Sequence, residues 1–265
     1  MSAPRRLPAA ILAALASFMV AAQARAADLA VYTGGSMSAP LKAVGADFTR
    51  TTGQGLSFVS GTTGVMLKKI RAGEKADVIV ISADGVEALR KEGRIAEGSI
   101  RPVASALLGV AVKAGAPKPD ISTPDKFKAA LLKARSVSYP DPALGATSGV
   151  YLETLFKQMG IAEAMKAKTV VKPIGADVAA AAATGEVELA ITFISEMLPD
   201  RRIEVAGTLP APILVPSPYV AGVSATAGDP AAARAFIDLI VSPAERGKLK
   251  AAGLDPAADE KLGLN

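Results

Sequence analysis

The order of apolar and polar positions along the chain predicts strands and helices in regular alternation. The apolar run at residues 78–81 lacks period-two alternation, as expected for a strand that is buried on both faces of a sheet, and residues 189–193 also read as a strand. Amphipathic segments, such as residues 65–72, alternate with the predicted strands and read as helices. This alternation predicts an α/β fold in which mainly parallel sheets are covered by helices.

Two longer apolar segments, residues 104–112 and 213–223, bracket a self-sufficient block of strands and helices. They predict a second lobe inserted into the first and joined to it by two crossing strands. Lobe 1 would comprise residues 27–106 and 212–265, and lobe 2 would comprise residues 107–211.

Four predicted helices begin directly after a strand and a short polar or glycine-rich turn. These starts are Gly35-Ser36 and Thr62-Thr63 in lobe 1, and Thr147-Ser148 and Asp177-Val178 in lobe 2. Free N–H groups and the positive dipole end at a helix N-terminus favour an anion. Each hydroxyl could equally be an ordinary helix cap. Because all four follow the carboxyl ends of strands, they indicate an anion site in a cleft between facing lobes.

The N-terminus has the pattern of a cleavable signal peptide over residues 1–26. Arg5 and Arg6 precede an uncharged stretch, residues 7–22, and Ala24-Arg25-Ala26 forms an A-x-A cleavage signal. A membrane anchor is the alternative, but the apolar core is short for a span. We therefore expect export to the periplasm and a mature chain that begins near Ala27.

Charge and composition exclude several classes of function. The formal net charge of +5 falls to +2 when the three arginines of the signal peptide are removed, and no Lys/Arg stripe interleaved with aromatic residues indicates nucleic-acid binding. The sequence has no Cys and no His, which removes thiolate chemistry, the commonest general base and the commonest metal ligand. We expect a binding protein without metal or cofactor; Ser–Lys catalysis is the enzyme alternative.

Several motifs resemble those of the periplasmic molybdate-binding proteins of ABC transporters, a branch of the two-lobed solute-binding proteins. The resemblance extends from Ala27 to Leu254, and its motifs are Gly61-Thr62-Thr63-Gly64, residues 67–73, Ser148-Gly149-Val150-Tyr151 and Thr184-Gly185-Glu186. It implies a monomer with a periplasmic binding protein fold that captures a small oxyanion, such as molybdate or tungstate, and passes it to a membrane permease. An organic carboxylate or another anion, bound for uptake or sensing, is the alternative.

The resemblance also implies which residues contact the ligand. The matching hydroxyl and backbone donors are Ser36, Thr62, Thr63, Ser148 and Val178. Phe193 stands where the family has a tyrosine that contacts the oxyanion, so this ring cannot donate a hydrogen bond. The first turn is also Gly-Gly-Ser where the family usually has Ala and Ser.

Overall fold

The computed structural model describes residues 27–257. The predicted signal peptide, residues 1–26, lies outside the described residues. Within residues 27–257, no helix is both long enough and apolar enough to cross a membrane.

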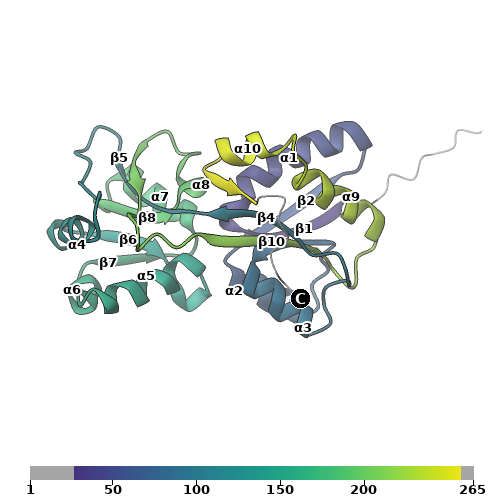
Figure 1. Ribbon diagram of the computed structural model, residues 1–265, viewed down its shortest axis with the longest axis horizontal. Coiled ribbons are helices and arrows are strands. Elements are labelled where there is room, and N and C mark those ends of the chain that lie inside the picture. Colours follow the sequence, from purple (N-terminus) through teal and green to yellow (C-terminus); the bar gives the residue numbers. More distant parts are fainter. Residues whose placement is uncertain (1–26, 258–265) are drawn as a thin grey trace, which may run out of the picture.

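The described chain forms two sheets with helices packed against them (Figure 1). The six-stranded sheet has the order β11-β4-β10-β3-β1-β2, and the five-stranded sheet has the order β7-β6-β8-β5-β9. The strands are β1 (Leu29–Gly34), β2 (Leu56–Gly61), β3 (Val78–Ser82), β4 (Arg101–Ala106), β5 (Leu108–Lys113), β6 (Val137–Pro140), β7 (Thr169–Lys172), β8 (Leu189–Phe193), β9 (Ile203–Thr208), β10 (Ser217–Val223) and β11 (Leu254–Pro256). The helices are α1 (Gly35–Thr52), α2 (Thr63–Arg71), α3 (Ala83–Lys91), α4 (Pro124–Lys133), α5 (Thr147–Gln158), α6 (Ala162–Lys166), α7 (Gly175–Thr184), α8 (Ile194–Met197), α9 (Pro230–Ile240) and α10 (Arg246–Ala251), with a 3₁₀ turn at Pro142–Leu144.

The sheets are mixed, whereas the sequence predicts mainly parallel ones. Strands β1, β2 and β3 pair in parallel, as do β7, β6 and β8. The strands that carry the chain between the sheets run the other way: β5 is antiparallel to β8 and β9, and β10 is antiparallel to β3 and β4. The βα alternation identified the parallel units but gave no sign of the direction of these crossing strands.

The chain crosses between the sheets twice, along the middle of the molecule (Figure 1). The first crossing is the predicted apolar segment 104–112, which is divided between β4 and β5 with only Leu107 between them. The second runs from β9, which the sequence did not predict, into β10. The six-stranded sheet therefore takes its strands from both ends of the described chain and the five-stranded sheet from its middle, while the lobe boundaries at 106/107 and 211/212 stay a prediction.

Strand β3 shows why its apolar run has no alternation. Val78, Ile79, Val80 and Ile81 are all fully buried. Val78 and Val80 belong to the cluster that includes apolar side chains of α1 and α9, whereas Ile79 and Ile81 pack with those of α2 and α3. Each such side chain contributes about 1.5–3 kcal/mol through burial, so helices on both faces stabilise the sheet that carries half of the cleft.

Helix α1 starts at Gly35, in agreement with the predicted start at Gly35-Ser36, whereas α7 starts at Gly175, two residues before the predicted start at Asp177-Val178. Neither start has a side-chain cap from its own N-cap residue. Ser242-Pro243 has the sequence of a helix cap followed by a first-turn Pro, but α10 starts later, at Arg246.

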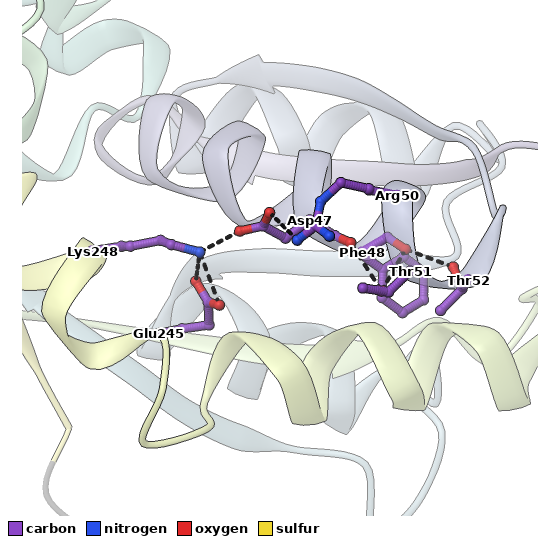
Figure 2. Close-up of polar contacts among 7 residues, drawn as sticks. All are labelled: Asp47, Phe48, Arg50, Thr51, Thr52, Glu245 and Lys248. Atoms are coloured by element: carbon purple, nitrogen blue, oxygen red, sulfur yellow. Dashed lines mark hydrogen bonds and ion pairs between the residues drawn. The ribbon is translucent and has the colours of Figure 1, made fainter.

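Helix α10 is tied to α1 by an ion-pair network (Figure 2). Lys248 bonds the carboxylates of Asp47 and Glu245, and Arg50 bonds Asp47 at 3.0 Å. The hydrogen bond from Lys248, followed by that from Arg50, holds the pKa of Asp47 below its usual value. Such partly exposed pairs contribute little individually, but here they join the C-terminal helix to the helix whose N-terminus faces the cleft.

Candidate functional site

A cleft lies between the two sheets, and elements of both line it. Its empty space is about 290 Å³ when the adjoining open solvent is included. The starts of α1 and α2 come from the six-stranded side, and the starts of α5 and α7 come from the five-stranded side. Three of the four predicted starts, namely Gly35-Ser36, Thr62-Thr63 and Thr147-Ser148, line the cleft, and the fourth helix reaches it at Gly175 instead of Asp177-Val178. Five of the six predicted site residues line the cleft, namely Ser36, Thr62, Thr63, Ser148 and Phe193.

Val178 lies elsewhere. It is fully buried inside α7, and its N–H donates to the carbonyl of Ile174 at 3.3 Å. Because α7 begins at Gly175, the residues that line the cleft at this helix are Ile174 and Gly175. The prediction that Val178 supplies a free backbone donor is therefore wrong, because the helix begins one turn earlier, at Gly175.

The Ser36 hydroxyl is a buried polar group that interacts with the Tyr219 hydroxyl but makes no hydrogen bond of normal geometry within the described chain. Ser36 lies in the first turn of α1 and is only 1% exposed. Leaving a buried hydroxyl unpaired costs about 1–3 kcal/mol. A ligand oxygen in the cleft would remove that cost.

The two threonines use their hydroxyl groups within the protein. Thr62 is the N-cap of α2, where its Oγ1 accepts from the N–H of Val65 at 3.1 Å, and it donates to the carbonyl of Leu144. Thr63 Oγ1 accepts a long hydrogen bond, 3.4 Å, from the N–H of Ser82. The Thr63 proton therefore remains available to a ligand.

The two sides of the cleft touch each other backbone to backbone. The N–H of Gly64 donates to the carbonyl of Gly145 at 3.2 Å. A Cβ on Gly64 would lie 2.6 Å from the carbonyl oxygen of Leu144, and one on Gly145 would lie 2.7 Å from the Cα of Gly64. Glycine at both positions is what permits this close contact at the cleft.

Tyr219 contributes a phenol hydroxyl that the sequence did not predict. It comes from β10, and its ring packs edge-on against Phe193 with centroids 6.2 Å apart. Burial raises the pKa of Tyr219, hydroxyls of Ser36 and Thr147 oppose the rise, and the charge of Glu196 adds to it. The net shift is upward, so the hydroxyl stays protonated as a donor. Tyr219 lies in an apolar run whose pattern indicates a core strand, so nothing in the sequence indicated that its hydroxyl lines the cleft.

Glu196 places a carboxylate in the cleft. It is carried by the four-residue helix α8, and its Oε2 accepts from the Thr192 hydroxyl at 2.5 Å. Burial raises the pKa of Glu196 to about 7, against the hydrogen bonds of Thr192 Oγ1 and the N–H groups of Phe193 and Gly175, which lower it. Phe193 is the N-cap and Glu196 the third residue of α8, the spacing of a capping box. Because the N-cap is Phe rather than Ser or Thr, the sequence lacks the full capping-box signature, and Glu196 could not be recognised from it.

Two glycines make room for this carboxylate. A Cβ on Gly35 would lie 2.4 Å from Glu196 Oε1, and a Cβ on Gly175 would lie 1.8 Å from Glu196 Oε2. The carboxylate thus lies between the N-termini of α1 and α7, whose dipoles favour its negative charge. Next to it, a Cβ on Gly34 would lie 2.6 Å from the Tyr219 ring. The Gly-Gly-Ser turn therefore accommodates Tyr219 and Glu196.

The cleft offers hydrogen-bond donors from neutral groups and a single carboxylate. Within residues 27–257, no cluster of three or more acidic side chains could hold a metal ion. The arrangement is suited to an anion that is bound by hydroxyl and backbone donors and that presents a different group to Glu196.

Comparisons with known proteins agree with this architecture. The aconitate isomerase of Pseudomonas sp is 30% identical over 259 residues, covering 95% of this chain and 97% of that protein. The molybdate-binding protein ModA of Azotobacter vinelandii is 27% identical over 256 residues, covering 92% and 96%. The solved structure of the Azotobacter vinelandii periplasmic molybdate-binding protein superposes with a TM-score of 0.75 at 20% identity, covering 87% of this chain and all of that one.

The two-lobed fold is thus the one seen in periplasmic binding proteins. The model of the family described as bacterial extracellular solute-binding protein matches residues 29–255, nearly all of the described chain. The chain belongs to the bacterial extracellular solute-binding proteins.

Proposed function

We propose that this protein is the periplasmic binding component of an ABC importer and that its ligand is a small organic carboxylate held in the cleft. The observation that carries the choice of ligand is the Glu196 carboxylate between the starts of α1 and α7. Molybdate and sulfate expose only hydrogen-bond acceptors, so an ionised Glu196 would repel them at close range. An organic acid can turn a C–H or O–H group toward Glu196 instead.

The opposite side of the cleft supports an anion as the ligand. The Ser36 hydroxyl makes no hydrogen bond of normal geometry within the described chain, and Tyr219 keeps its proton. The first-turn N–H groups of α1 and α5 have no side-chain cap from the N-cap residue. A hydrogen bond to a charged ligand contributes about 1.5–3 kcal/mol. Two or three such bonds to one carboxylate would offset the cost of removing it from water.

The relatives support both ligand classes by their names. One is named for aconitate, a carboxylate, and one for molybdate, and each covers nearly the whole chain. The molybdate-like ligand that the sequence predicts is therefore the competing outcome of the test.

A thermal-shift panel on residues 27–265 separates the two ligand classes. The panel contains aconitate, citrate and succinate together with molybdate, tungstate and sulfate. A specific ligand stabilises the protein by about 2.7 kcal/mol at a hundredfold excess over its dissociation constant. We expect a carboxylate to raise the unfolding temperature. Stabilisation by molybdate or tungstate alone would overturn the proposal.

One observation favours a second candidate function, isomerisation of the bound carboxylate. The sequence predicts a binding protein without catalytic activity, and this expectation stays a prediction. However, an acid with a pKa of about 7 lines the cleft, as a general acid–base catalyst requires, and the relative that is 30% identical is named an isomerase. Incubation of the protein with one geometric isomer of aconitate, followed by chromatography, tests this function. Failure of the other isomer to form above the uncatalysed rate would exclude it.

A further inference from the structure

The turn at residues 34–36 brings two kinds of group together. Oε1 of Glu196 lies against Gly35, and the Tyr219 ring lies against Gly34. The next residue is Ser36, whose buried hydroxyl interacts with that of Tyr219 but makes no hydrogen bond of normal geometry with the described residues. A carboxylate and two hydroxyl donors therefore converge on one short stretch of backbone at the start of α1.

We propose that Glu196 is the catalytic base of this cleft and moves a proton between two carbons of a bound unsaturated carboxylate, with Ser36 and Tyr219 holding the charge that develops. This inference rests on the proposed carboxylate ligand. The substrate class is an acid in which a C=C bond is conjugated to a carboxylate and flanked by a CH₂ group.

The two oxygens of Glu196 have different surroundings. Oε2 accepts from Thr192 Oγ1 at 2.5 Å and lies next to Gly175, so it is held in place. Oε1 lies against Gly35, which precedes Ser36 in the chain, and Ser36 and Tyr219 line the same cleft. We assign Oε1 as the atom that takes the proton. Thr192 is a positioning residue, because it acts through the carboxylate.

The step balances without an oxidant or a second reactant. Oε1 removes a proton from the CH₂ carbon, and the C–H electron pair forms a new C=C bond while the original π electrons move onto the conjugated carboxylate. The resulting dienolate has its extra charge on the oxygens that Ser36 and Tyr219 can bond. The carboxyl group of Glu196 exchanges its proton with solvent, the charge returns to the far carbon of the original double bond, and that carbon takes a proton from Glu196.

The surroundings suit a base that works near neutral pH. Burial of the Glu196 carboxylate strengthens it as a base while the N-termini of α1 and α7 keep it able to ionise. The backbone hydrogen bond from Gly64 to Gly145 joins the two sides of the cleft that contains this carboxylate.

A structural role is the competing explanation, because the Glu196 carboxylate also caps α8. Glu196→Gln keeps an oxygen that can accept from Thr192 and from backbone N–H groups, but it has no basic carboxylate. The test measures calorimetric binding of aconitate and, by NMR in D₂O, the incorporation of deuterium into bound and released aconitate. Glu186→Gln is the control, since Glu186 pairs with Lys172 on the surface.

We expect wild-type protein and Glu186→Gln to incorporate deuterium at the same rate. Glu196→Gln should bind aconitate but exchange about 10²–10⁴-fold more slowly, the usual contribution of a general base. Equal exchange by Glu196→Gln would overturn the inference. Binding by the wild type without any exchange would also overturn it and would leave the proposed binding function intact. Failure of every carboxylate to bind would overturn both.

Discussion

Gly35 and Gly175 leave the space in the cleft that the Glu196 carboxylate occupies. Gly175→Ala would put a Cβ 1.8 Å from Glu196 Oε2, so the carboxylate must move or α7 must shift. We expect a loss of about 1–3 kcal/mol in the free energy of unfolding, as for other overpacked sites. Gly247→Ala is the matched control, because nothing lies within 4 Å of a Cβ there. Urea unfolding of both variants measures the difference, and equal stabilities would contradict the assigned position of Glu196.

Glu196 also predicts a pH dependence of stability. Its pKa is about 7 in the folded protein against 4.5 for a free side chain, so the folded state favours the protonated form. Its contribution to stability is therefore fully present below pH 4.5 and is lost as the pH rises through 7. Tyr219 is the titratable group that faces it, and its raised pKa keeps it neutral in this range.

Glu196→Gln isolates this contribution. Each pKa unit corresponds to about 1.4 kcal/mol, so the stability difference between the variant and the wild type should change by up to about 3 kcal/mol between pH 4.5 and 8. The variant should gain on the wild type as the pH rises. A difference that stays constant over this range would show that Glu196 has an ordinary pKa.

The Tyr219 hydroxyl should contribute to affinity. Tyr219→Phe keeps the ring against Phe193 and removes one donor, so ligand affinity should fall about tenfold to a hundredfold. Tyr32→Phe is a suitable control, because that hydroxyl bonds Glu74 rather than lining the cleft. Isothermal titration of both variants gives the comparison. An unchanged affinity in Tyr219→Phe would mean that the hydroxyl does not reach the ligand.

At the level of elements, the sequence was most informative where burial and periodicity agree. The apolar run of β3 predicted a strand that is buried on both faces. Thr123-Pro124 and Asp229-Pro230 have the sequence of a cap followed by a first-turn Pro, and in the structure Thr123 and Asp229 accept hydrogen bonds from the first turns of α4 and α9. The early start of α7 was missed because Glu196, a residue distant in sequence, interacts with the N–H of Gly175. Helix α8 has only four residues, too few for a periodic pattern.

In the site, too, the sequence could not reveal roles that depend on contacts between distant segments. Ser36, Thr62, Thr63 and Ser148 could be found because they stand at helix starts, where a hydroxyl has a recognisable purpose. Tyr219 and Glu196 could not, because their roles depend on which strands and helices meet across the cleft.

The start of α2 allows affinity to be separated from stability. Gly64→Ala should strain the backbone contact with Leu144 and Gly145 but improve the helix by up to about 1 kcal/mol. We therefore expect weaker ligand binding with no comparable loss of stability. Calorimetry and urea unfolding of the same sample test both parts. Unchanged affinity would show that this contact does not contribute to closure.

At the scale of the whole molecule, two crossings of the chain connect the two sheets, and the cleft lies between them. This arrangement is typical of proteins that close on a ligand by hinge motion. Small-angle scattering should show a smaller radius of gyration when the protein is saturated with ligand. The same radius with and without ligand at saturation would argue against hinge closure.

The claim that the cleft binds an organic carboxylate rather than molybdate is tested most directly by two calorimetric titrations of residues 27–265 at pH 8. One titration uses aconitate and the other uses molybdate. At this pH Glu196 is mainly ionised. We predict saturable binding of aconitate and no measurable binding of molybdate, because only the carboxylate can present a C–H group to Glu196. Tight binding of molybdate without binding of aconitate would contradict the account.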